Sequence, residues 1–338
     1  MGNGVKNGLL LTEGHLLVIL PVPEIAAAET LSLLRTKYPK LKITFRTGLK
    51  PTDLDADELA ALWRDCTILT TLLCYPPNLE AVPNLKLVHA PGAGIDSLEN
   101  PVFSAPHIRA TTSNGIAAPT ISEWFIAQLL NHTRQLEKFR VLQRETTWNQ
   151  SINELIGVRD LVGQRIGVLG YGSIGRQSAR IASALGMEVL AYTAQPRTTT
   201  ESKKDRNYIV KGTGDPDGTI PSEWYSGTDK ESLHNFLAQK LDVLLISLPL
   251  TTFSRGLIGA DEYKVLKENS PRGCFLANVS RGDVLVQDDL IKALKDEKSG
   301  LSGAALDVTT PEPLPNDDPL WTAPRLSRIG IWNGSLVS

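Results

Sequence analysis

A glycine-rich turn near the middle of the chain has the spacing of a nucleotide-phosphate site. It reads Gly170-Tyr171-Gly172-Ser173-Ile174-Gly175 and follows the apolar run 165–169, which is typical of a buried strand. We expect Gly170 to permit the tight turn, Gly172 to leave room for a pyrophosphate beside backbone N–H groups, and Gly175 to let helix and strand pack closely. Between a strand and a helix, this spacing favours a dinucleotide site over a glycine-rich turn without function.

The next strand should carry the residues that choose between the two nicotinamide cofactors. An NAD site usually has Asp or Glu about 20 residues further on, where it binds the ribose 2′-hydroxyl. No carboxylate occurs in residues 189–200. Thr193 can hydrogen-bond a 2′-phosphate without repelling it, and Arg197 can pair with it through a charge-assisted fork. The sequence therefore favours NADP(H) and leaves NAD(H) open; if Arg197 is only a solvated loop charge, Lys203 or Lys204 can serve instead.

Two series of strand and helix patterns must position these residues. In the first series the expected strands are 16–20, 42–45, 68–74 and 85–89, with helices over 24–37 and 55–65. In the second they are 165–169, 189–192, 243–247, 273–278 and 303–307, reached through a linking helix over 123–138. Strands separated by helices imply right-handed crossovers and parallel sheets. We predict an α/β protein with two Rossmann-like domains, a flavodoxin-like substrate domain and a doubly wound NAD(P)-binding domain.

The domain boundaries follow from the same patterns. We place the substrate (catalytic) domain at residues 1–115 and the NAD(P)-binding domain, with the linking helix, at residues 116–324. Residues 195–227 are polar, contain several glycines and prolines and lack clear periodicity, so we expect a surface insertion on the rim of the nucleotide domain. Residues 325–338 form an atypical C-terminal tail with no helical or strand register.

Composition and charge argue against several classes of partner. The 338 residues include 35 Lys plus Arg and 37 Asp plus Glu, so no large basic field favours nucleic acid or a membrane surface. The cysteines Cys66, Cys74 and Cys274 are too scattered for a disulfide framework or a metal cluster. The early apolar run 16–21 is far shorter than the roughly 18 residues of a membrane span. We expect a cytoplasmic protein with a small-molecule substrate and no metal.

Four further motifs accompany the glycine-rich turn in a fixed order along the chain. They are Pro91–Asp96, Ser247–Thr251, Asn278–Asp283 and Leu306–Pro315. With these motifs the chain resembles the D-isomer-specific 2-hydroxyacid dehydrogenase family, of the glyoxylate/hydroxypyruvate reductase type, over about residues 84–320. The resemblance implies an NAD(P)-dependent oxidoreductase that reduces a small 2-oxo acid to a D-2-hydroxy acid, or the reverse. It also implies a homodimer, which is common among relatives with this linking helix.

The resemblance assigns roles to particular residues. Arg281, just past the end of a strand, matches the family's catalytic arginine, and its guanidinium could hold and polarise a 2-oxo acid in a fixed fork. Ala93 and Gly94 match the loop whose N–H groups hold the substrate carboxylate. Glu312 matches the glutamate that raises the pKa of a histidine general acid. Cofactor contacts are expected from Asp307, at the nicotinamide carboxamide, and from Leu248, Pro249 and Val279.

Each of these residues also has a plain structural interpretation. Arg281 could be a turn arginine paired with Asp283, residues 93–94 could be an ordinary tight turn, and Glu312 could be a loop carboxylate.

The sequence departs from the family at its C-terminal end. The family pattern continues into Thr-Pro-His-x-x-Gly, but here Ile331 stands near the expected position of the histidine, and losing such an acid costs about 10²–10⁴ in rate. His89, His107, His132 and His234 are expected to be structural or solvated. The abrupt loss of the match after about residue 324 suggests an altered reading frame or splice form. An NAD(P)-binding regulator without turnover and another NAD(P)-dependent Rossmann oxidoreductase, acting on formate or phosphoglycerate, are the alternative functions.

Overall fold

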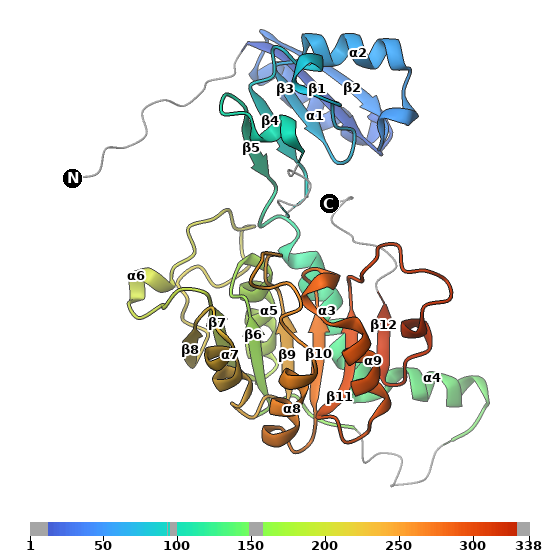
Figure 1. Cartoon of the computed structure of the whole chain (residues 1–338), viewed down its shortest axis with the longest axis vertical. Helices are drawn as coiled ribbons and strands as arrows, with labels where there is room; N and C mark the ends of the chain where they lie inside the picture. Colours follow the sequence, from blue (N-terminus) through green and yellow to red (C-terminus); the bar gives the residue numbers. More distant parts are fainter. Residues whose placement is uncertain (1–12, 93, 95–99, 149–157, 330–338) are drawn as a thin grey trace. The chain divides into compact units, whose positions relative to one another are not determined.

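Two parallel β-sheets, each flanked by helices, form the framework of the protein (Figure 1). The computed structural model describes residues 13–92, 94, 100–148 and 158–329. The chain divides into Met1–Asn114 and Gly115–Ser338, here called the first and second units. The predicted α/β class, with two Rossmann-like domains, is confirmed.

The first unit contains a five-stranded sheet in the order β2-β1-β3-β4-β5, in which every pair is parallel. The strands are β1 (Gly14–Leu20), β2 (Leu41–Thr47), β3 (Ile68–Thr71), β4 (Leu87–Ala90) and β5 (Arg109–Thr112), and the helices are α1 (Glu24–Lys37) and α2 (Ala56–Asp65). α2 begins after Asp55, whose side chain accepts a hydrogen bond from the Glu58 N–H. This strand order is that of flavodoxin-like folds, as the sequence predicts.

The second unit contains a seven-stranded parallel sheet in the order β12-β11-β10-β9-β6-β7-β8. Its strands are β6 (Arg165–Leu169), β7 (Glu188–Thr193), β8 (Glu223–Ser226), β9 (Val243–Ile246), β10 (Cys274–Asn278), β11 (Leu301–Leu306) and β12 (Leu326–Ile329). Its helices are α3 (Ala118–Arg134), α4 (Leu136–Arg144), α5 (Ser173–Ala184), α6 (Thr200–Lys203), α7 (Lys230–Leu237), α8 (Ala260–Asn269) and α9 (Gln287–Lys295). Strand order reverses between β6 and β9, which is where doubly wound sheets bind their ligands.

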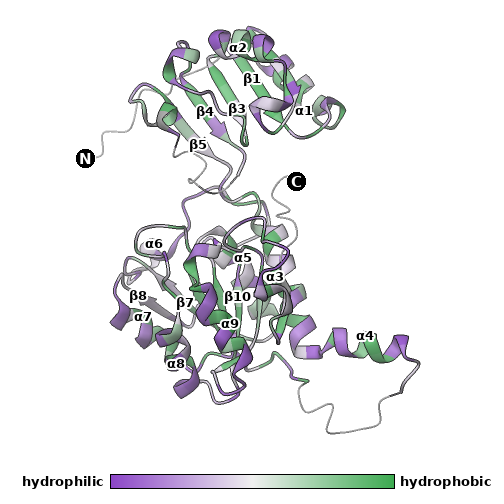
Figure 2. Cartoon of the chain, turned by 45° about the vertical axis from the view of Figure 1, so that its right-hand side comes forward, coloured by the Kyte–Doolittle hydropathy of each residue, from purple (hydrophilic) through white to green (hydrophobic). Residues whose placement is uncertain are grey.

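Apolar cores cover both faces of the second sheet. Residues of α3 and α5, such as Phe125 and Ala179, pack on one face, and residues of α7, α8 and α9, such as Phe236 and Leu294, pack on the other. All residues of β9 and β10 are buried, as expected for central strands of a parallel sheet. Figure 2 shows a similar contrast by colour, with hydrophobic strands β1 and β3 in the first sheet and mainly polar helices α7 and α8 in the second unit.

Short 3₁₀ turns complete the connections. They cover Pro51–Asp53, Leu79–Ala81, Pro101–Ser104, Gly282–Val284 and Pro319–Thr322. Among the described residues, no helix has the length and apolar character needed to cross a membrane.

Several sequence-based boundaries need correction. The linking helix predicted over 123–138 begins at Ala118 and ends at Arg134; Gln135 adopts a left-handed conformation with φ 53°, and α4 follows it. No glycine or proline stands at this break, so the sequence carries no ordinary signal for it. Residues 195–227 are more than a surface insertion, because they contribute the edge strand β8 and bury Asp215.

The first residues of the predicted tail 325–338 also differ from the prediction in their secondary structure. Strand β12 lies within it and pairs with β11, so residues 326–329 do have a strand register. Arg325, just before β12, donates hydrogen bonds to the backbone oxygens of Ala293, Leu294, Leu301 and Asp296. These bonds hold the end of α9 and the start of β11, which explains why the sheet gains a further strand after Pro324.

Candidate active site

The glycine-rich turn between β6 and α5 has the geometry of a phosphate cradle. Gly170 has φ +101°, and a Cβ there would lie 2.8 Å from the Ser247 backbone. A Cβ on Gly175 would lie 2.2 Å from the Gly170 oxygen, so α5 packs directly on the turn. Gly172 differs, because a Cβ there would meet nothing within 4 Å. The open space before Gly172, at the N-terminus of α5, fits a dinucleotide pyrophosphate.

A cavity of about 780 Å³ extends from this turn. Its walls come from the ends of β6, β7 and β9 and from the segment after β7, which places it at the reversal of strand order. Of the predicted cofactor residues it is lined by Gly170, Tyr171, Gly172, Thr193, Arg197, Leu248 and Pro249. Ser173, Ile174 and Gly175 continue into α5, and Val279 is buried in the core with only 4% exposed.

One part of this cavity is lined by the cations Arg197, Lys204 and Arg206. It is here called the ribose end, because the ribose of the cofactor is expected there. Arg197 donates from Nη1 to the Ser202 oxygen at 2.6 Å, and its buried Nε has no hydrogen-bond partner in the described structure. Thr193 Oγ1 donates to the Gln195 oxygen at 2.8 Å, so its hydroxyl oxygen still has lone pairs. Of the two lysines predicted as substitutes, Lys204 lines the cavity, whereas the Lys203 ammonium lies 5.7 Å from the centre of the Trp224 ring.

Two further residues of the ribose end, Glu201 and Arg206, were missed by sequence reasoning. Lys204 Nζ and Arg206 Nη2 pair with the carboxylate of Glu201 at 3.0 and 2.9 Å. These two cations hold the pKa of Glu201 below its usual range. Arg206 and Glu201 also line the cavity. The charge pattern of residues 201–206 was visible in the sequence, but its place beside the cofactor pocket depends on how the segment folds back.

The residues expected at the substrate, Arg281, Asp307 and Glu312, lie near the carboxyl ends of β10 and β11, a region here called the substrate end. Arg281 follows β10 in a turn shaped by Asn278, whose amide donates to the Arg281 oxygen at 2.9 Å and whose Oδ1 accepts from the Ser280 hydroxyl at 2.7 Å. Arg281 Nη1 donates to the Ser280 oxygen at 2.8 Å. Asp283, the alternative partner in the sequence, forms an ion pair with Arg255.

The turn of Arg281 packs against the loop that carries Asp307 and Glu312. A Cβ on Gly282 would lie 2.1 Å from the Thr309 backbone, so only glycine allows this approach. Glu312 Oε1 accepts a hydrogen bond from the Thr309 N–H at 2.9 Å. Asp307 donates its N–H to the Asn278 oxygen at 2.9 Å. Three predicted site residues from two motifs therefore meet at one edge of the sheet.

Asp307 is the most perturbed carboxylate of this edge. Burial, followed by the negative charge of Glu312, raises its pKa to about 6. A buried carboxyl with a raised pKa is a recurrent property of functional sites.

The predicted carboxylate loop and the expected position of the acid fall largely outside the described residues. Ala93 and Ile331 lie outside them, and Gly94 is half-buried in the first unit.

The described histidines lie in structural settings. His132 stacks on Phe275 near the amino end of the second sheet, and burial lowers its pKa to about 4. His234 contacts Glu262 between α7 and α8 at 2.8 Å. His89 contacts Thr111 and Ser113 in the first unit. None of these contacts is with Arg281 or Glu312.

Comparisons with known proteins agree with this arrangement. Residues 126–213 and 215–328 match the family model "D-isomer specific 2-hydroxyacid dehydrogenase, NAD binding domain". The glyoxylate reductase of Korarchaeum cryptofilum is 29% identical over 261 residues, which cover 76% of this chain and 70% of that protein. The human glyoxylate reductase/hydroxypyruvate reductase is 28% identical over 240 residues, covering 71% of this chain and 64% of that protein.

The fold matches solved structures as well. A D-isomer specific 2-hydroxyacid dehydrogenase family protein from Aeromonas salmonicida superposes with a TM-score of 0.73 and 26% identity, covering 96% of this chain and 91% of that chain. The family model spans more than half of the sequence. The chain therefore belongs to the D-isomer specific 2-hydroxyacid dehydrogenase family, whose members are NAD(P)-dependent oxidoreductases acting on CH–OH donors.

Proposed function

We propose that the protein reduces a small 2-oxo acid, such as glyoxylate or hydroxypyruvate, to the D-2-hydroxy acid with NADPH. The observation that carries this proposal is the packing of the Arg281 turn on the Asp307–Glu312 loop, at the same sheet edge as the phosphate cradle. The names of the relatives support the substrate class, since two of them are glyoxylate or hydroxypyruvate reductases.

The bound nicotinamide would supply the hydride, and the residues of the chain would orient the acceptor. Arg281 offers a planar fork of N–H donors that fits the carboxylate of a 2-oxo acid and polarises the neighbouring carbonyl. Backbone N–H groups at Ala93 and Gly94 are the proposed second anchor for that carboxylate. Asp307 is the proposed partner of the nicotinamide carboxamide.

The carbonyl oxygen also needs a proton. Glu312, which in the family supports a histidine acid, is held here by the Thr309 N–H, and Ile331 stands where the sequence pattern expects the histidine. Isoleucine cannot donate a proton, so the loss of this acid would lower the rate by about 10²–10⁴. This observation favours a second candidate, an NAD(P)-binding regulator without turnover.

The preference for NADPH rests on the cations of the ribose end. Arg197, Lys204 and Arg206 line that end, and the carboxylates Glu201 and Asp205 in the same wall are already paired with cations. A phosphate there would meet positive charge, whereas a ribose hydroxyl would find no carboxylate without a cation partner. NADH stays within the proposal as the weaker cofactor.

A homodimer is part of the same proposal. Helix α4 supports it, because Leu136 and Val141 are exposed on a helix without buried residues. Light scattering on the purified protein measures the mass directly.

A spectrophotometric assay tests the function. Purified protein should oxidise NADPH in the presence of glyoxylate or hydroxypyruvate, followed by loss of the nicotinamide absorbance. Binding of NADPH without oxidation would support the regulator, and no binding at millimolar NADPH would contradict both candidates. Arg197→Ala should weaken NADPH much more than NADH; equal losses would count against Arg197 as the phosphate partner.

A further inference from the structure

The segment 195–227, here called the inserted segment, forms most of the outer wall of the cofactor cavity. Between β7 and β8 it contributes the lining residues Arg197, Thr199, Glu201, Ser202, Lys204, Asp205, Arg206 and Asn207. A wall built from a polar, glycine-rich segment can select a ligand only if something fixes its conformation, because an unfixed loop would lose entropy on binding. The polar residues inside the segment show how it is fixed.

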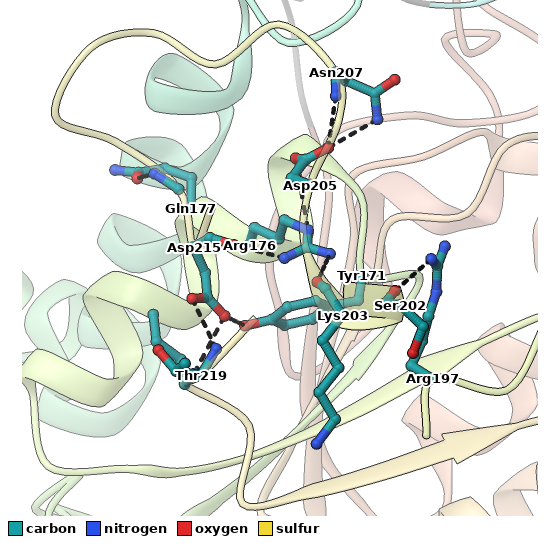
Figure 3. Close-up of polar contacts among 12 residues, drawn as sticks. Tyr171, Arg176, Gln177, Arg197, Ser202, Lys203, Asp205, Asn207, Asp215 and Thr219 are labelled. Atoms are coloured by element: carbon teal, nitrogen blue, oxygen red, sulfur yellow. Dashed lines mark hydrogen bonds and ion pairs between the residues drawn. The ribbon is translucent and has the colours of Figure 1, made fainter. Parts of the chain in front are cut away.

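Arg176, in the first turns of α5, holds the inserted segment at two points (Figure 3). Its Nη2 donates to the Lys203 oxygen at 2.7 Å, and its Nη1 donates to the Asp215 oxygen at 2.5 Å. Its Nε lies 3.6 Å from the carboxylate of Asp205. The residue is only 4% exposed, so its charge is removed from water and compensated by this segment.

Tyr171, from the phosphate cradle itself, completes the contact. The Arg176 guanidinium lies 4.9 Å from the centre of the Tyr171 ring, and the Tyr171 hydroxyl donates to Asp215 Oδ2 at 2.8 Å. The carboxylate of Asp215 also accepts the N–H groups of Thr219 and Ile220. Two interior parts of the segment also pack together here, since a Cβ on Gly218 would lie 2.4 Å from the Lys203 oxygen.

The position of the Lys203 carbonyl determines which way the side chains of the neighbouring residues point. With its carbonyl on Arg176, Lys203 extends toward Trp224, away from the cavity lining. Lys204 and Arg206 then line the cavity, with Glu201 between them as counterion. Asp205 receives the N–H and side-chain amide of Asn207, which fixes the turn between the two cations.

We propose that Arg176 is a positioning residue that determines selectivity for the 2′-phosphate, by holding the inserted segment so that Arg197, Lys204 and Arg206 face the ribose. The inference rests on the proposed preference for NADPH. Arg176 does not need to bind the phosphate itself, because its donors are directed at Lys203, Asp205 and Asp215.

Binding of adenosine 2′,5′-bisphosphate and adenosine 5′-monophosphate, measured by calorimetry, tests the inference. R176K keeps the charge but loses the planar fork. It should weaken the bisphosphate by about tenfold, close to the contribution of one charged hydrogen bond, and the monophosphate by less than about threefold. R180K is the matched control, because Arg180 also donates to the segment, at the Gly214 oxygen, but is exposed and does not line the cavity. It should bind both nucleotides as the wild type does.

A second background separates positioning from direct contact. In a variant lacking the three cations, R197A/K204A/R206A, the further change R176K should leave bisphosphate affinity unchanged, since the groups it positions are gone. An additive loss in that background would overturn the inference and make Arg176 a phosphate ligand. Equal losses for both nucleotides in R176K would overturn it as well, because a general structural defect has no selectivity.

Y171F keeps the test decisive if R176K does not fold. It removes only the hydroxyl bond to Asp215 and should reduce the ratio of bisphosphate to monophosphate affinity by a few-fold; an unchanged ratio would contradict the inference. A wild-type protein without preference for the 2′-phosphate would instead refute the cofactor proposal. A wild type with that preference and an R176K variant that retains it would refute the positioning role alone.

Discussion

The pKa values of the carboxylates at the ribose end and at the substrate end of the second unit are shifted in opposite directions. At the ribose end, Glu201 lies between Lys204 and Arg206, and its pKa is lowered by those cations. At the substrate end, burial and a neighbouring carboxylate raise the pKa of Asp307 to about 6. The first arrangement neutralises charge before a ligand arrives and suits binding. The second favours the protonated form of a buried carboxyl, a property often found at functional sites.

Arg281 is the proposed anchor of the substrate, and its substitution should have the largest effect. Arg281→Lys keeps the charge but loses the fork, and we expect kcat/KM for glyoxylate to fall by about 10²–10³. Arg255→Lys is the control, because Arg255 belongs to the same region and pairs with Asp283. Steady-state kinetics on both variants tests this prediction. Similar kcat/KM values for the two variants would show that Arg281 has no role in the reaction.

Two glycines of the phosphate cradle allow cofactor binding and protein stability to be tested separately. Gly172→Ala places a methyl in the open space before α5, so both NADPH and NADH should bind about tenfold more weakly. Gly175→Ala instead meets the Gly170 oxygen, and should lower the free energy of unfolding by about 1–3 kcal/mol. Calorimetric titration and thermal melts measure the two effects. The comparison fails if Gly172→Ala destabilises the protein more than Gly175→Ala.

The sequence predicted the inner strands of both sheets and the edge strand β2, and missed the edge strands β5, β8 and β12. β6, β9 and β10 are apolar runs buried on both faces, so they are conspicuous in the sequence. β5 and β8 are edge strands of partly polar, exposed residues, and β12, at the other edge of the second sheet, follows a segment without periodicity. An edge strand owes its place to the neighbour it pairs with, which local patterns do not reveal.

The same contrast holds for the site residues: some stand in local sequence motifs, and others depend on tertiary contacts. The cradle and Arg281 stand in contiguous motifs: spacing predicts the cradle, and the resemblance to the family predicts the role of Arg281. Arg176 was not predicted, because its partners Lys203, Asp205 and Asp215 come from a distant, aperiodic segment whose contact with α5 is not revealed by local patterns. The choice between Lys203 and Lys204 could not be made from sequence either, since it depends on which of two neighbouring residues gives its carbonyl to Arg176.

Asp307 should make stability depend on pH at the substrate end. Its folded pKa of about 6 lies above the ordinary value of about 3.9, so the folded protein binds more protons than the unfolded chain between these pH values. Its contribution to stability therefore declines as pH rises from about 4 to 6, and the full cost of the buried charge is present above that range. Asp307→Asn should raise Tm by about 2–4 °C at pH 8 and by less at pH 5. Thermal melts at the two pH values would contradict this if the gain were larger at pH 5.

Glu201 offers the smallest and most specific test of the ribose end. It pairs with the two cations that a 2′-phosphate would also attract, so the phosphate must compete with its carboxylate. Glu201→Gln should therefore tighten NADPH by a few-fold and leave NADH nearly unchanged, an effect that high salt should reduce. Asp217→Asn is the matched control, because it removes one negative charge from an exposed position of the same inserted segment, outside the cavity lining. Weaker NADPH binding by Glu201→Gln would reverse the interpretation, since Glu201 would then hold Lys204 and Arg206 in place rather than compete for them.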